Sequence, residues 1–127
     1  PRYNLASTIS LIVAQRLARR LCERCKEAVE ISEKVLTEQG LTAQLHPSPR
    51  LFRAKGCGDC GDGFRGRIGF YEVVPVSESL SRIIMEGGRT QRFRKHMRKH
   101  GLLDLRQAAL LKVSQGLTSL EEANRLT

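Results

Sequence analysis

Four cysteines, arranged as two Cys-x-x-Cys pairs, carry the clearest chemistry in this sequence. The first pair is Cys22 and Cys25, the second is Cys57 and Cys60, and residues 26–56 separate them. Two intervening residues let a tight turn aim both sulfurs at one metal ion, and two such turns build a tetrahedral shell of four thiolates. A closed shell has no open position for substrate. The spacing therefore predicts one structural zinc ion per chain.

Three other interpretations of the cysteines stay open from the residues alone. Two disulfides would need an oxidising compartment, and no secretory leader is apparent. A redox site would need only one Cys-x-x-Cys, at the start of a thioredoxin-like helix. An iron site could use the same four thiolates, although nothing else in the chain suggests an electron carrier. We favour zinc, and we expect Gly58 and Gly61 to let the amides of the second turn donate to sulfur.

The histidines are weaker candidates. His96 and His100 are four residues apart on an expected helix and could form a metal pair, but no carboxylate or third ligand is nearby in the sequence. A solvated basic face explains them better, and His46 stands alone in a loop. The glycine-rich segment 56–66 lacks the Gly-Lys-Ser/Thr ending of a phosphate loop. We therefore predict no catalytic and no cofactor-binding residue.

The charge is strongly positive, with 22 Lys and Arg against 13 Asp and Glu and a formal net charge of +9. Four thiolates and one Zn²⁺ would together add −2 and leave about +7. Such a charge favours either a nucleic-acid or anionic-membrane surface, or Arg-rich faces that meet acidic protein partners. We favour the second interpretation, because the cations are dispersed and no aromatic platform accompanies them.

The cysteines must be positioned by flanking elements, and the patterns predict these elements. Apolar residues at helical spacing predict a helix from Leu5 to Leu21, directly before Cys22. A run of β-formers predicts the best strand over Arg67–Val76, with Pro75 at its end. Between them we expect a short strand and a helix ending at Gly40, a loop at 46–49 and a short strand over 51–55.

The remainder of the chain is predicted to be helical. Ser77 should cap a first helix, Phe93 and Met97 mark a second, and Asp104 opens a third that Gly116 follows. A last helix should be capped by Thr118 with Glu121 or by Ser119 with Glu122. The predicted fold class is α+β: a small zinc-stapled, β-containing subdomain followed by a helical subdomain of three to four helices.

Three stretches follow one another in a distinctive order. They are Ala-Gln-Arg-Leu-Ala-Arg-Arg-Leu-Cys within residues 14–26, Gly-Phe-Arg-Gly-Arg-Ile-Gly-Phe-Tyr-Glu-Val over 63–73, and the segment 110–122. Together they resemble the end of the ATPases of bacterial type IV pilus assembly and type II secretion, the PilB/GspE family. The chain departs from the family pattern at Phe70, where Ile is more common, and in the basic run Arg92–Lys99.

This resemblance implies a division by role. Residues 1–21 would be the last helix of the ATPase core, residues 22–76 the tetracysteine zinc-binding subdomain, and residues 77–127 the helical C-terminal subdomain. The resemblance also implies zinc on Cys22, Cys25, Cys57 and Cys60. The chain begins at Pro1 without Met, and no apolar run is long enough to span a bilayer. We therefore expect it to be a piece of a longer parent protein.

The implied parent is a hexameric ATPase in the bacterial cytoplasm, peripheral at the inner face of the cytoplasmic membrane. Its partners would be an inner-membrane platform protein and the other ring subunits, with no specific nucleic acid. ATP and Mg²⁺ would bind the parent only, because the family's Walker A, Walker B, Asp-box and His-box elements precede this region. We expect no ATP hydrolysis by this chain alone.

The branch of the family is a finer question. The sequence of residues 82–87, Arg-Ile-Ile-Met-Glu-Gly, resembles that of pilus assembly ATPases more than that of type II secretion ATPases. Retraction ATPases lack the cysteine module and are disfavoured. Two alternatives remain: the same region of a type II secretion ATPase, and, more distantly, an independent zinc-ribbon module that binds nucleic acid.

Overall fold

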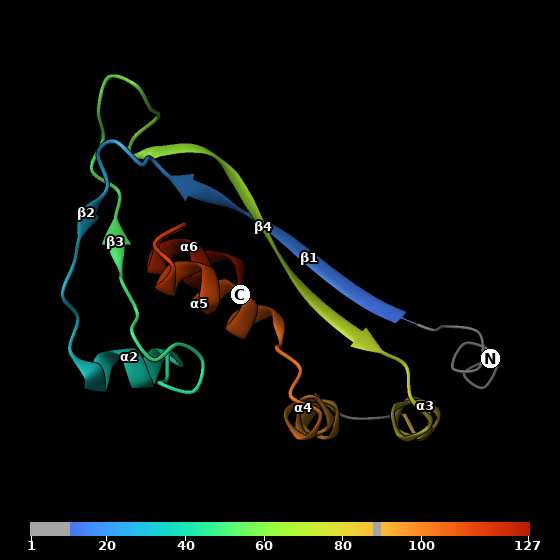
Figure 1. The fold of residues 1–127 in the computed structure, drawn as a ribbon. Coiled ribbons are helices and arrows are strands. Elements are labelled where there is room, and N and C mark those ends of the chain that lie inside the picture. The colour runs from blue at the N-terminus through green and yellow to red at the C-terminus, as the bar shows by residue number, and fades with distance from the viewer. Residues whose placement is uncertain (1–10, 88–89) are drawn as a thin grey trace. The chain divides into compact units, whose positions relative to one another are not determined.

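A computed structural model describes residues 11–87 and 90–127, and it confirms the predicted α+β class (Figure 1). Within these residues two two-stranded sheets form, one from β1 and β4 and one from β2 and β3. The elements are, in chain order, β1 (Leu11–Leu21), β2 (Glu27–Ala28), α2 (Glu33–Gln39), β3 (Phe52–Arg53), β4 (Phe64–Pro75), α3 (Glu78–Met85), α4 (Thr90–Lys99), α5 (Leu105–Ser114) and α6 (Leu120–Leu126).

The chain forms two compact units, each assembled from segments that are distant in sequence. The α3–α4 unit comprises residues 1–14 and 71–104, and the cysteine unit comprises residues 15–70 and 105–127. The predicted helical C-terminal segment is thus shared, because α5 and α6 belong to the unit that contains the cysteines. The division by role at residues 21 and 76 stays a prediction, and the compact units follow different boundaries.

The helix predicted from Leu5 to Leu21 is wrong where the structure describes it. Residues 11–21 form strand β1, which pairs with β4, and residues 5–10 lie outside the described residues. Leu11, Val13 and Leu17 are exposed, whereas Ala18 is buried. The apolar residues of this segment satisfy both a helical and an alternating pattern, so local sequence could not decide between them. Pairing with β4 decided it.

The cysteine unit contains the larger hydrophobic core. β2 and β3 pair antiparallel, with Glu27 opposite Arg53 and Ala28 opposite Phe52. The predicted strand and helix between the cysteine pairs are confirmed, and α2 ends at Gly40 as expected. The buried residues of this core are Ala18, Leu41, Leu51, Phe70, Ala108, Ala109, Leu110, Val113 and Ala123.

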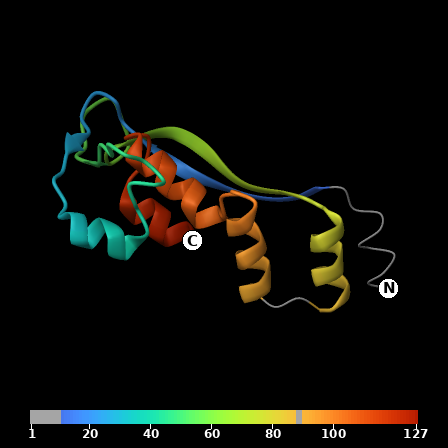
Figure 2. The same ribbon diagram turned by 60° about the horizontal axis from the view of Figure 1, so that its bottom comes forward.

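The α3–α4 unit has a small core of Val74, Leu80 and Met97. The predicted cap is confirmed, since the Leu80 amide donates to Ser77 Oγ at 3.1 Å. Helices α3 and α4 lie side by side (Figure 2). Strand β4 confirms the strand predicted over Arg67–Val76, but it begins earlier, at Phe64, and ends one residue sooner, at Pro75. None of the helices in the described ranges is long and apolar enough to cross a membrane.

Helices α5 and α6 begin directly after residues that were predicted to cap them. α5 starts directly after Asp104, and Gly116 follows its end. Of the two cap pairs proposed for α6, the structure uses Ser119, whose Oγ accepts a hydrogen bond from the Glu122 amide at 3.2 Å. The Glu122 carboxylate points elsewhere and bonds two arginines, as described below.

Candidate metal centre

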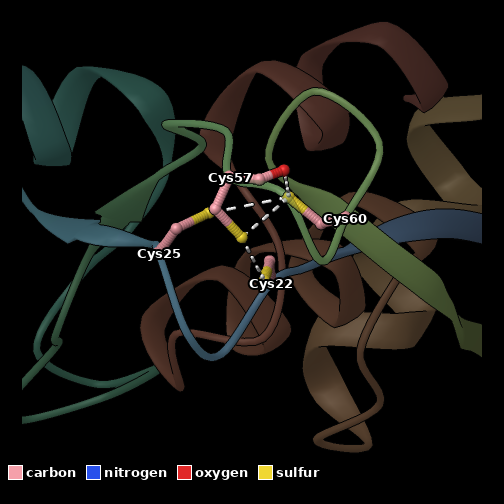
Figure 3. Close-up of side chains that lie close together, drawn as sticks. All are labelled: Cys22, Cys25, Cys57 and Cys60. Carbon is pink, nitrogen blue, oxygen red and sulfur yellow. Dashed lines mark hydrogen bonds between the residues drawn. The ribbon is translucent and has the colours of Figure 1, made fainter.

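The four cysteine sulfurs converge at one point of the cysteine unit (Figure 3). All four lie within 4.8 Å of one another. The Sγ–Sγ distances are 3.9 Å for Cys22–Cys57, 3.7 Å for Cys25–Cys60 and 3.5 Å for Cys57–Cys60. A tetrahedron with metal–sulfur bonds of about 2.3 Å has edges of about 3.8 Å. The sulfurs therefore already stand at the spacing that one tetrahedral metal ion requires.

The alternatives raised by the sequence fare differently in this geometry. All four cysteines are free thiols, so no disulfide joins them. In the described part of the chain they are also the only close group of three or more potential metal ligands. The geometry suits any metal that accepts four thiolates, which leaves zinc and iron as the candidates.

The two cysteine turns are fixed to each other through the backbone. Cys22, directly after β1, donates its amide to Gly63 O at 2.9 Å. Gly63 has a φ of +97°, and a Cβ there would lie 2.5 Å from Ala54 Cβ. Only glycine meets both demands without strain. A salt bridge between Arg24 and Asp59, at 2.8 Å, adds a second link between the turns.

Backbone amides donate to the sulfurs: that of Asp59 follows Gly58 in the second turn, as predicted, and those of Arg24, Cys25 and Gly56 lie outside that turn. The amides of Arg24 and Cys25 favour the thiolate of Cys22 and lower its pKa to about 7, against burial. The Asp59 amide also lowers the pKa of Cys57, but hydrogen bonds with the neighbouring thiols, first that of Cys60, and burial raise it to about 12. Gly56 donates to Cys25 Sγ at 3.4 Å. The Cys22 thiol thus ionises readily, whereas a bound cation would be needed to ionise Cys57 near neutral pH.

The first cysteine turn is also tied to the connection between α5 and α6. The Leu21 amide donates to Leu117 O at 3.0 Å. Lys26 Nζ donates to Gly116 O at 2.9 Å and lies 4.4 Å from the centre of the Phe52 ring. No spacing in the sequence signals the two hydrogen bonds, because they join residues 90 or more positions apart. They attach the candidate metal centre to the helical part of its own unit.

A buried carboxylate reinforces this attachment. Glu122 of α6 accepts from the backbone amide of Arg19 at 2.9 Å and from the side chains of Arg19 and Arg125. Burial raises the pKa of Glu122, but the hydrogen bonds from Arg125 and Arg19 outweigh it and lower the pKa to about 2. Thr118 Oγ1 donates to Arg19 O at 2.8 Å. The end of β1 that leads to Cys22 is therefore held by α6. Sequence reasoning treated Glu122 only as a capping residue.

The histidines do not join the cysteines. His46 Nδ1 accepts from the Ser48 amide at 3.1 Å, a local contact within its loop. His96 and His100 belong to the α3–α4 unit, with ring centres 4.4 Å apart.

Comparison with known proteins gives the family. The model of the family described as "Type II/IV secretion system protein" matches residues 1–125. The chain is 45% identical over 127 residues to a protein named type IV pilus assembly ATPase PilB from Pseudomonas aeruginosa, and 42% identical to its namesake from Acinetobacter baylyi. The two alignments cover 100% and 98% of this chain.

A second group of relatives carries a different name. The chain is 36% identical over 124 residues to a type II secretion system protein E from Pseudomonas aeruginosa, with 97% of the chain aligned. The chain spans only 22–24% of the length of these three relatives. The family match extends over nearly the whole chain, and so the protein belongs to the type II/IV secretion system family.

Proposed function

We propose that this chain is the zinc-binding coupling region of a hexameric ATPase that powers type IV pilus assembly. The observation that carries the proposal is the convergence of Cys22, Cys25, Cys57 and Cys60, at tetrahedral spacing, in a chain 45% identical to a protein named as a pilus assembly ATPase. The runner-up is the same region of a type II secretion ATPase. Two relatives named for pilus assembly, at 45% and 42% identity, exceed the 36–37% of relatives named for type II secretion and support the pilus branch, whereas other pilus relatives, at 35% and 32%, do not separate the two branches.

Bound zinc would supply a redox-inert tetrahedral cross-link. Cys22 and Cys25 would hold it from the end of β1, and Cys57 and Cys60 from the loop before β4. The cross-link closes residues 26–56 into a loop that contains β2, α2 and β3. Glu122, Lys26 and Leu117 attach the same turn to α5 and α6. In this proposal the cysteine unit acts as a stiff body through which the motor transmits conformational change.

The working context of the motor is also part of the proposal. The parent would hydrolyse ATP with Mg²⁺ in the bacterial cytoplasm and act on an inner-membrane platform protein. Large apolar side chains are exposed at alternate positions of the strand segments in the α3–α4 unit: Leu11 and Val13 of β1, Tyr71 and Val73 of β4. Exposed apolar faces of this kind mark contact surfaces. We assign these exposed side chains to contacts with the remainder of the motor.

The test is complementation with the full-length parent. Cys57→Ser should abolish pilus assembly while ATP binding persists, because the coupling region and not the nucleotide site is altered. The matched control is Gly58→Ala in the same turn, where an added methyl group meets no atom within 4 Å. Assembly that survives Cys57→Ser would refute the coupling role.

Metal analysis of the purified chain separates the remaining alternatives. One zinc per chain is expected, and iron, or no metal at all, would refute the zinc assignment. The chain alone should show no ATP turnover above a boiled control. Tight DNA binding that weakens steeply with added salt would instead support the nucleic-acid module.

A further inference from the structure

A cavity of about 300 Å³ lies between α3 and α4, and basic side chains dominate its lining. Helix α4 contributes Arg92, Lys95, His96 and Lys99, the turn directly after it contributes His100, and α3 contributes Ser79 and Ile83. None of these lining residues is acidic. The cavity belongs entirely to the α3–α4 unit and shares no residue with the cysteine centre.

The basic residues gather there because of their helical spacing. Positions 92, 95, 96, 99 and 100 fall on one face of an α-helix. The adjacent face carries Met97 into the core. Helix α4 contains no Asp or Glu, so none of its own residues offsets the repulsion between like charges one turn apart. Glu86 forms a salt bridge with Arg92 at 2.8 Å. This contact does not neutralise the charges of Lys95 and Lys99.

One member of the group is buried, which an ordinary solvated face does not explain. His96 is only 7% exposed. Together with His100 it also borders a second cavity of about 130 Å³, lined by Pro75, Ser77 and Leu102. Burial, His100 and Lys99 lower the pKa of His96, so its imidazole is neutral near pH 7 and keeps one N–H to donate.

The set of donors defines the ligand. Lys95 and Lys99 provide positive charge that the Glu86–Arg92 pair does not offset, while His96, His100 and Ser79 provide hydrogen bonds at the same opening. A divalent cation would be repelled by these charges. Phosphate suits them, since several oxygens and two negative charges can be satisfied at once. Nucleic acid is disfavoured, because no aromatic side chain lines the cavity for base stacking.

We propose that the cavity between α3 and α4 is a binding site for a phosphate-bearing anion. Lys95 and Lys99 hold the charge, and His96 and Ser79 orient the oxygens. The cavity is large enough to admit a phosphate or diphosphate group. The same chemistry is presented by a soluble phosphate compound and by the headgroup of an anionic lipid. This inference does not depend on the proposed motor function or on zinc identity.

The experiment uses the zinc-loaded 127-residue chain and inorganic pyrophosphate. Titration followed by NMR should shift the imidazole resonances of His96 and His100 in a saturable manner, while His46 stays unchanged as an internal reference. The double variant Lys95→Gln/Lys99→Gln should weaken binding at least tenfold. The matched control, Arg94→Gln/Arg98→Gln, removes the same charge from positions outside the cavity lining and should weaken binding less than twofold.

Each outcome decides the proposal. Equal weakening by both double variants, or no response of His96, would show that pyrophosphate binds only to diffuse charge, and the site would be rejected. The response of His96 in the unaltered chain tests the site even if a variant misfolds. Vesicles of phosphatidylglycerol then identify the source: competition with pyrophosphate indicates a lipid headgroup, and its absence indicates a soluble phosphate.

Discussion

The two compact units differ in what stabilises them. In the described part of the cysteine unit, nine buried apolar residues form one core, next to four converging thiols and the buried carboxylate of Glu122. In the described part of the α3–α4 unit, three buried residues form the core, and its second helix carries a basic cavity. The comparison suggests that the cysteine unit provides rigidity, whereas the α3–α4 unit provides a surface for ligands.

The largest test of this contrast is removal of the metal. Cys57→Ser should release zinc and unfold the cysteine unit, including α5 and α6, because these helices contact the first cysteine turn. Structural zinc contributes roughly 10–16 kcal/mol of apparent binding free energy, against a net domain stability of about 5–15 kcal/mol. Amide exchange should show lost protection over residues 22–70 and 105–127, with more protection kept in α3 and α4. Full protection of residues 22–70 in chelator would show that zinc does not organise this unit.

A backbone substitution should have the next largest effect. Gly63→Ala places a Cβ 2.5 Å from Ala54 Cβ at a φ of +97°, so strain and overlap add. We expect a loss of about 2–6 kcal/mol in the free energy of unfolding, measured with denaturant. Gly66→Ala is the control, because its φ is +79° but no atom lies within 4 Å, and it should cost only about 1 kcal/mol. Similar losses for both would show that the packing against Ala54 is unimportant.

The buried carboxylate gives the cysteine unit a pH dependence in the acid range. The pKa of Glu122 is about 2 in the folded chain, below its ordinary value of 4.5. Its contribution to stability is therefore present above pH 4.5 and is lost as the pH falls toward 2. At about 1.4 kcal/mol per pKa unit, the contribution is on the order of 3 kcal/mol.

The variant Glu122→Gln separates the contribution of the Glu122 carboxylate to stability from the effects of thiol titration. The stability difference between the original chain and the variant should be roughly constant from pH 7 to 5 and should shrink below pH 4.5. Unfolding curves at several pH values provide the measurement. A difference that stays constant down to pH 3 would show that the ion pairs with Arg19 and Arg125 contribute little.

The smallest effect is expected on the surface of α4. Neutralising the exposed Arg94 and Arg98, or Lys95 and Lys99, should change the free energy of unfolding by less than about 0.5 kcal/mol, because exposed charges add little. Thermal unfolding of both double variants checks this. Unfolding of either variant would mean that α4 supports the core of its unit through these side chains, and the contrast between the two units would then need revision.

Local sequence was sufficient wherever a signal lies within a few residues. The Cys-x-x-Cys spacing predicted the four side chains that converge, and the predicted caps at Ser77 and Ser119 stand where helices α3 and α6 begin. The β-forming run predicted β4 with its end at Pro75. The caps, the strand and the spacing within each cysteine pair depend on near neighbours, which one sequence displays directly.

The tertiary structure decided the features that depend on distant residues. Residues 11–21 carry a pattern that fits a helix or a strand, and hydrogen bonding to β4 made them a strand. The assignment of α5 and α6 to the cysteine unit follows from their shared core and from Glu122 reaching Arg19 across the chain. The basic face of α4 was visible in the sequence, but its cavity exists only because α3 packs beside it. Such long-range contacts are selected by packing and by the pairing of buried polar groups, and neither is written in local spacing.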